Sequence, residues 1–205
     1  MLFRSFGKLL GQQAYNNCNQ AMDLCPLQTY SVDNIDANKT FCPSCEDDFN
    51  FCFGANNTIW FKFTTNTYGG VGTVNFSNLV FQNSAGQGSS LQATVLSASV
   101  PCQADSYIAM GNCESAGTVN FTLTVDTLLP NTTYFVVVSG DVGATSAAEC
   151  SFDISVTGAA VDRSAAAIQL DTTVSSVCKG QTYTAIAYPQ NCPDVSMFKW
   201  YVNGI

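Results

Sequence analysis

The sequence contains no histidine, which removes the side chain most often used as a general base in catalysis. Neither a Ser-His-Asp nor a Cys-His arrangement is therefore possible. No Gly-x-Gly-x-x-Gly or phosphate-binding loop is present. Glycoside hydrolysis needs two paired carboxylates, and nothing in the sequence singles out two of its 15 acidic residues. We expect a protein that is not an enzyme.

Basic residues and long apolar runs are also scarce. Residues 9–162 contain two basic side chains, Lys39 and Lys62, against 13 acidic ones, and the net charge of the chain is −8. Such a surface repels nucleic acid and anionic membranes. No apolar stretch approaches the ~20 residues of a membrane helix. We expect no nucleic acid partner and no membrane insertion.

Cysteine, by contrast, is abundant. Ten cysteines in 205 residues favour an oxidising compartment, because cytosolic reductants would leave most of them as reactive thiols. The alternative is a metal protein, but without histidine a zinc site would need cysteine or carboxylate ligands. Only one close pair, Cys42-x-x-Cys45, is present. We therefore expect disulfides and an extracellular or cell-surface location.

Most of the chain shows the apolar–polar alternation of strands that bury one face. The cleanest run places four side chains inward: Val119, Phe121, Leu123 and Val125. Residues 133–138 are apolar almost without a break, which is typical of a central strand covered on both faces. Strands are predicted at 59–65, 119–125, 133–138 and 152–156, with weaker candidates at 72–76, 79–82, 91–98 and 106–110. Seven or eight short strands separated by turn residues predict an all-β sandwich.

The pattern changes twice along the chain. We assign residues 15–158 to the sandwich, 159–169 to a linker of small residues, and 170–205 to the first strands of a second sandwich that is too short to be complete. Residues 1–14 form a leader of uncertain role, of which residues 1–5 match the translation of a common sequencing adapter. Both ends therefore look truncated.

Five features occur together within residues 17–158. They are an Asn-Cys-x-x-Ala start (Asn17–Ala21), a cysteine followed by Ile-Trp-Phe-Lys-Phe-Thr (Ile59–Thr64), a cysteine pair (Cys102 and Cys113), a Leu-Leu-Pro-Asn-Thr-Thr-Tyr turn and strand (Leu128–Val138), and a closing Phe-x-Ile-x-Val (Phe152–Val156). Together they resemble the jelly-roll modules of large secreted surface proteins of gliding bacteria, which are similar to the prepeptidase C-terminal domain. The resemblance implies a jelly-roll-like antiparallel β-sandwich without catalytic residues.

The C-terminal segment resembles a different family. Its Val177-Cys-Lys-Gly and Phe198-Lys-Trp-Tyr-Val-Asn-Gly204 motifs look like the first half of an immunoglobulin-like or polycystic-kidney-type repeat. The resemblance implies that Trp200 packs across the interior of that second sandwich.

These resemblances imply surface adhesion, gliding or delivery through the type IX secretion route. We expect a structural and adhesive module whose partners are neighbouring modules of the same polypeptide, surface glycans or other cells. The alternative is a carbohydrate- or calcium-binding accessory domain attached to a secreted hydrolase, because similar modules lie beside proteases and glycosidases. No cofactor other than calcium is expected.

A disulfide between Cys102 and Cys113 is predicted, because only ten residues separate them between two predicted strands. Bridging such a loop stabilises a fold by roughly 2–3 kcal/mol in the chain-entropy model, and the bacterial modules point to the same pair. The sequence leaves 15 connectivities open for six further cysteines: Cys18, Cys25, Cys42, Cys45, Cys52 and Cys150. In the tail, Cys178 and Cys192 pair with each other or with partners beyond it.

Acidic residues supply the candidates for a calcium site. They are Asp33, Asp36, Glu46, Asp47 and Asp48, since calcium takes several carboxylate and carbonyl oxygens. No fixed ligand spacing is present, which favours a solvated acidic loop over a metal site. Among the aromatic residues, Trp60 alternates with Phe61 and therefore lies on the other face of its sheet, either under a loop or as a sugar-stacking ring.

Overall fold

The computed structural model describes residues 15–26, 28–38 and 52–162, together with the short segments 169–170 and 187–188. The chain falls into two compact units, Met1–Asp162 and Arg163–Ile205. In the second unit, β10 (Gln169–Leu170) and β11 (Ala187–Tyr188) pair antiparallel. The first unit contains these elements in chain order: η1 (Cys18–Gln20), β1 (Met22–Asp23), β2 (Thr29–Asp33), β3 (Ile59–Thr64), β4 (Gly70–Phe81), β5 (Leu91–Ala98), η2 (Ala104–Ser106), β6 (Tyr107–Gly117), β7 (Phe121–Leu128), β8 (Thr133–Gly140) and β9 (Cys150–Thr157).

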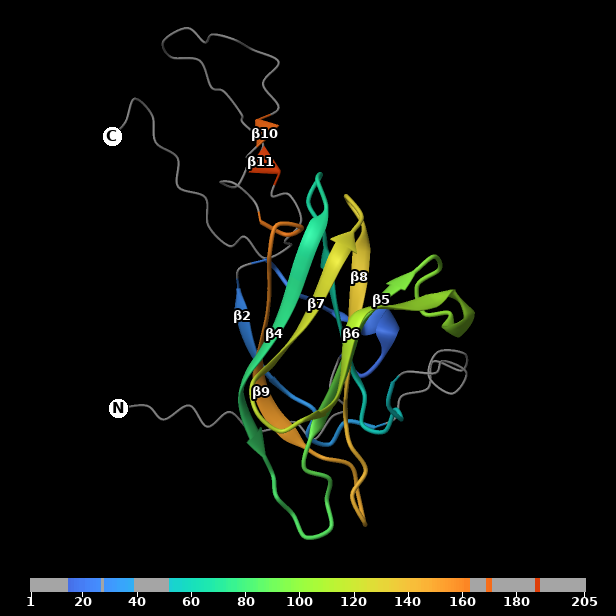
Figure 1. Cartoon of the computed structure of the whole chain (residues 1–205), viewed down its shortest axis with the longest axis vertical. Coiled ribbons are helices and arrows are strands. Elements are labelled where there is room, and N and C mark those ends of the chain that lie inside the picture. The colour runs from blue at the N-terminus through green and yellow to red at the C-terminus, as the bar shows by residue number, and fades with distance from the viewer. Residues whose placement is uncertain (1–14, 27, 39–51, 163–168, 171–186, 189–205) are drawn as a thin grey trace, which may run out of the picture. The chain divides into compact units, whose positions relative to one another are not determined.

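The first unit is an all-β sandwich of two sheets (Figure 1). One sheet has the order β2-β9-β4-β7, and the other has the order β1-β3-β8-β5-β6, in which the two-residue β1 joins β3 in parallel. Apart from the β5–β6 hairpin, each connection from β2 to β9 crosses from one sheet to the other. Eight antiparallel strands in the orders β2-β9-β4-β7 and β3-β8-β5-β6 form a jelly roll. The expected fold is confirmed for this unit.

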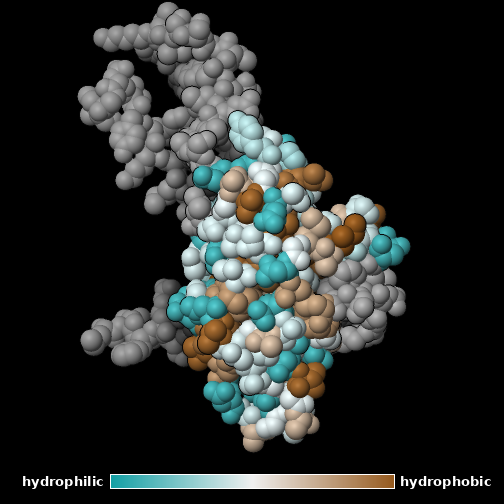
Figure 2. All heavy atoms as spheres, in the orientation of Figure 1, coloured by the Kyte–Doolittle hydropathy of each residue, from teal (hydrophilic) through white to brown (hydrophobic). Residues whose placement is uncertain are grey.

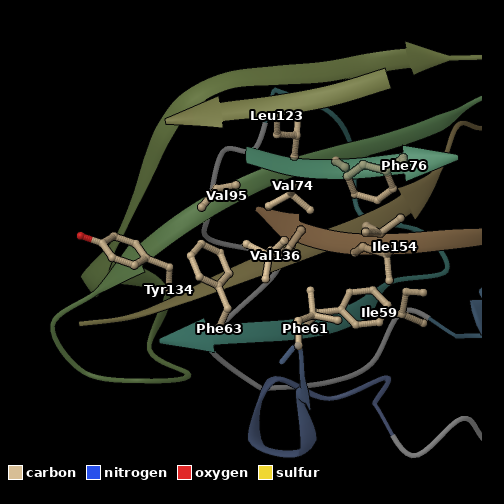
Figure 3. Close-up of a cluster of buried hydrophobic side chains, with 14 of the residues drawn as sticks. Ile59, Phe61, Phe63, Val74, Phe76, Val95, Leu123, Tyr134, Val136 and Ile154 are labelled. Carbon is tan, nitrogen blue, oxygen red and sulfur yellow. The ribbon is translucent and has the colours of Figure 1, made fainter. Parts of the chain in front are cut away.

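The core lies between the two sheets and follows the alternation of the strands. Figure 3 shows Phe61 and Phe63 of β3 with Val136 of β8 on one side, facing residues of β4, β7 and β9 on the other. Phe76 stacks on Phe121 with ring centroids 4.4 Å apart. Offset aromatic pairs of this kind stabilise a core beyond the area that they bury.

Strand β8 is buried on both faces, as the unbroken apolar run predicted. Every residue from Tyr134 to Gly140 is buried. Val136 and Val138 point into the core between the sheets, while Phe135 and Val137 belong to a second apolar cluster on the outer side of the sheet. The second cluster means that the outer face of the sheet is covered as well.

Several strand boundaries differ from the sequence prediction. The candidates at 72–76 and 79–82 form one strand, β4, because the register shift between Ser77 and Val80 is a bulge within the strand and not a turn. Asn78 adopts a positive φ of 54° at this bulge. Strand β2 was not predicted. The inward position expected for Val119 is wrong, since its side chain is 72% exposed and precedes β7.

The sandwich continues through four residues that the sequence analysis placed in the linker. Ala160 and Val161 are fully buried in the core. The side-chain amide of Asn66 donates to the backbone oxygens of Ala159 at 2.7 Å and Asp162 at 2.8 Å. Small residues are ambiguous in a sequence because they suit both flexible linkers and closely packed contacts. Residues 159–162 are therefore a structural part of the sandwich.

We predict that a chain ending at Asp162 unfolds at the same temperature as the sandwich of the full chain. In a chain ending at Gly158, the free energy of unfolding should fall by about 3 kcal/mol, because the burial of one valine side chain alone contributes about 1.5–3 kcal/mol. For a domain of this size that loss lowers the melting temperature by about 10 °C. Scanning calorimetry of the two truncated chains measures the difference. Equal melting temperatures would show that the sandwich ends before residue 159.

Candidate functional site

The outer face of the β3-β8-β5-β6 sheet carries a covered apolar cluster rather than an open surface. Trp60, Phe135 and Leu96 project from the sheet, and Cys18, Ala21 and Phe53 lie against them. Trp60 is fully buried. Its ring stacks on Tyr107 with centroids 5.7 Å apart and meets the edge of Phe135 at 6.4 Å. The predicted position of Trp60 opposite Phe61 is confirmed, but the ring has no free face on which a sugar could stack.

Two disulfides attach the covering residues to the sheet. Cys18 in η1 is bonded to Cys102 in the β5–β6 connection, with Cα atoms 5.6 Å apart. Cys52, shortly before β3, is bonded to Cys113 in β6, with Cα atoms 6.4 Å apart. Each bond joins an N-terminal segment to the β5–β6 hairpin. We call residues 16–21 and 52–55 the cover; it lies over Trp60 and its neighbours.

The predicted bond between Cys102 and Cys113 is therefore wrong. The prediction treated the ten residues between them as a loop, but Tyr107–Gly117 is the strand β6. An extended strand rises about 3.3 Å per residue, so Cys113 lies about 20 Å along β6 from its start at Tyr107. A disulfide requires Cα atoms less than about 7 Å apart. Cys102 therefore lies in the connection of the hairpin, whereas Cys113 lies well along β6.

The remaining cysteines divide into three groups. Cys25 is disulfide-bonded. Cys150 was expected to form a bridge, but it is a free, fully buried thiol at the start of β9. Burial raises the pKa of this thiol to about 11, although a backbone hydrogen bond from Val80 opposes the shift. It is therefore protonated and unreactive at neutral pH. The others lie outside the described residues: Cys42, Cys45, Cys178 and Cys192.

The candidate calcium ligands do not form a site in the described part of the chain. One carboxylate oxygen of Asp33 accepts the backbone N–H of Ile35 at 3.1 Å, which is the geometry of a local turn. Asp36 is exposed and adopts a positive φ of 58°. Glu46, Asp47 and Asp48 lie outside the described residues. Among the residues that are described, no three acidic or cysteine side chains are grouped so that they could hold a metal.

The outer face of the β2-β9-β4-β7 sheet is polar and carries a connected set of hydrogen bonds. Asp153 on β9 accepts the Ser31 hydroxyl at 2.6 Å and the Asn78 amide at 2.7 Å. Asn75 on β4 donates to the hydroxyl of Thr157 at 3.0 Å. Figure 2 shows this side of the molecule as mostly pale and teal, with small separate brown patches. Short polar side chains around the carboxylate of Asp153 thus form a solvated face.

No family model matches the sequence, and no curated protein matches it. Within the described residues, none of the helices has the length and apolarity needed to cross a bilayer.

We predict that the two disulfides contribute strongly to stability because they close long stretches of chain. Their sequence separations are 84 and 61 residues, for which chain entropy gives about 4 kcal/mol each. The double variants Cys18→Ser/Cys102→Ser and Cys52→Ser/Cys113→Ser should each unfold at correspondingly lower denaturant concentrations. Cys150→Ala is the matched control: it removes a buried thiol without a bond and should cost only about 1 kcal/mol. A non-reducing peptide map that joins Cys102 to Cys113 would contradict the assignment.

Asp153 should make the stability of the sandwich depend on pH in the acid range. Hydrogen bonds from Ser31 and then Asn78 lower its pKa in the folded state below the ordinary value of 3.8. Between these two pKa values the unfolded chain binds more protons, so stability decreases as the pH falls through this range. In Asp153→Asn this part of the pH dependence should disappear, while the exposed Asp126→Asn variant should keep it. Denaturant unfolding at a series of pH values measures both, and identical profiles for wild type and Asp153→Asn would refute the assignment.

Proposed function

We propose that this chain is a non-enzymatic structural and adhesive module of a large secreted or cell-surface bacterial protein. The observation that carries the proposal is the cover over Trp60, held by Cys18–Cys102 and Cys52–Cys113. Disulfides form and persist in oxidising compartments and are rare where glutathione and thioredoxin keep thiols reduced. A fold whose apolar sheet face is closed by two such bonds suits the outside of a cell.

The charge of the sandwich supports partners other than nucleic acid. In the part of the chain that the structure describes, Lys62 is the sole basic side chain. Its ammonium lies 3.6 Å from a carboxylate oxygen of Asp23. A surface with so little positive charge offers no counterion release to a phosphate backbone. Neighbouring modules of the same polypeptide, surface glycans and other cells are the partners that fit this surface.

A carbohydrate-binding accessory domain of a secreted hydrolase is the second candidate. It is favoured by an open cavity of about 410 Å³ at one end of the sandwich. Calcium binding is not supported in the same way. Asp33 and Asp36 are the candidate calcium ligands that the structure describes, and they do not belong to any group of residues that could hold a metal. The two candidate functions share the same module and differ in what the rest of the polypeptide does.

The proposal predicts a protein that adheres without turning over its target. Beads coated with the oxidised chain should attach to cell surfaces, whereas beads coated with the reduced and alkylated chain should not. The same preparation should release no product from a panel of glycosides, esters and peptides. Robust turnover would refute the non-enzymatic role, and equal attachment by both kinds of bead would refute adhesion by the folded module.

A further inference from the structure

The connections at one end of the jelly roll form a single packed unit. In Figure 1 the β4–β5 and β8–β9 connections lie together at the lower end of the sandwich. The backbone N–H of Gly88 donates to Ser146 O at 3.0 Å, and that of Thr145 donates to Gly86 O at 2.8 Å. Loops held on a rigid sandwich are where binding residues are usually found.

An open cavity of about 410 Å³ lies between this unit and the β2–β3 connection, within the range of ~300–1,000 Å³ that is typical of ligand sites. The described residues that line it are Ala37, Asn38, Asn56, Asn57, Val142, Ser146, Ala147 and Glu149. These residues come from segments that are about 90 residues apart in the sequence and that only the fold brings together. No basic or aromatic side chain is among them.

Two buried asparagines hold the cavity in shape. The side-chain amides of Asn34 and Asn57 both donate to the backbone oxygen of Ala148, at 2.9 and 2.7 Å. Their side-chain oxygens accept the backbone N–H groups of Cys150 and Gly140, each at 2.7 Å. Both asparagines are at least nine-tenths buried. The β8–β9 connection is thus fixed at both ends by bonds shielded from water, where they are strongest.

The fixed connection presents Glu149 to the cavity. One carboxylate oxygen of Glu149 accepts the backbone N–H of Asp36 at 3.0 Å, which orients the group. An ionised carboxylate has about four acceptor positions, so further hydrogen bonds to a ligand remain open to it. Asn56 is held by its own backbone N–H, which donates to the Ser139 hydroxyl at 3.0 Å. The Glu149 carboxylate, the Asn56 side chain and the Ser146 hydroxyl therefore line the same cavity as short apolar side chains.

This combination selects a ligand class. Anions are disfavoured because, among the described residues of the lining, the single charge is the negative charge of Glu149. Calcium is disfavoured because it takes six to eight oxygen ligands, commonly with several carboxylates, whereas Glu149 is the one carboxylate among the lining residues that the structure describes. The amide of Asn56 already donates to the backbone oxygens of Gly54 and Gly140. Sugar hydroxyls can donate to the Glu149 carboxylate and to the side-chain oxygen of Asn56, and they can pack their carbon atoms against Ala37 and Ala147.

We propose that the cavity binds a neutral saccharide of one or two rings, with Glu149 as the principal acceptor. The inference deepens the proposed adhesive role and rests on it, because it identifies what the module attaches to. Without an aromatic platform the dissociation constant for a single sugar should be on the order of 1 mM. Many weak sites on one surface then combine through multivalency.

The test uses the full chain, produced without N-glycans because Asn38 and Asn56 each begin an Asn-x-Thr sequence. Glucose, galactose, mannose, N-acetylglucosamine and their common disaccharides are titrated while the side-chain amide signals of Asn38 and Asn56 are followed by NMR. At least one sugar should shift these signals at millimolar concentration. Glu149→Gln keeps the acceptor for Asp36 and should weaken that binding about tenfold, since a charged hydrogen bond is lost. Asp126→Asn, with the same charge change on β7, should bind like wild type.

A second variant separates the loss of the site from the loss of the fold. Ser146→Phe fills the cavity without removing Glu149 and should abolish binding, with thermal unfolding confirming that each variant is folded. The inference is overturned if no sugar shifts the Asn38 and Asn56 signals, if calcium or inorganic phosphate shifts them and sugars do not, or if the folded Glu149→Gln and Ser146→Phe variants both bind like wild type. Beads that attach to cells while the sugars fail to bind would leave the adhesive role standing and remove only this site.

Discussion

The burial of β8 on both faces is the constraint on which the rest of the structure depends. A strand in a jelly roll normally buries one face against the opposite sheet and leaves the other in water. Here Phe135 and Val137 point away from the core between the sheets, beside Trp60. Exposed together, these side chains would form an apolar patch that invites association. The sheet therefore needs a second layer on its outer side.

The cover that supplies this layer has little means of holding itself in place. In the described residues it consists of a three-residue 3₁₀ helix and short irregular segments. Such segments form few backbone hydrogen bonds of their own, and ordering them costs conformational entropy. Cys18–Cys102 and Cys52–Cys113 reduce that cost by restricting the unfolded chain. The disulfides that support the proposed location thus hold in place the layer that this one strand requires.

The sequence predicted what depends on alternation and missed what depends on spatial neighbours. The runs around Phe61, Leu123 and Ile154 were correctly assigned to strands because their side-chain period is two. The pairing of Cys102 failed because the residues after it extend into a strand, which moves Cys113 far away. The free thiol of Cys150 could not be foreseen either, because the sequence does not distinguish a cysteine that is buried as a thiol from one that forms a disulfide.

The cavity could not be predicted from the sequence for a related physical reason. Asn34 and Asn57 stand in polar stretches that suggest ordinary loops, and nothing local marks them as residues that bond to a carbonyl more than 90 positions away. Only the jelly-roll order, in which β2 and β3 flank the connection from β8 to β9, brings them to Ala148.

The burial of Asn34 and Asn57 fixes the geometry of the β8–β9 connection at an energetic risk. Apolar residues in their place would leave the oxygen of Ala148 and the N–H of Gly140 without partners, and each unsatisfied buried group costs about 1–3 kcal/mol. A looser connection exposed to water would avoid both costs, because water would satisfy these groups. The fold instead fixes the backbone on either side of Glu149, which a scaffold alone does not require. The ligand binding proposed for this end of the sandwich would account for that precision.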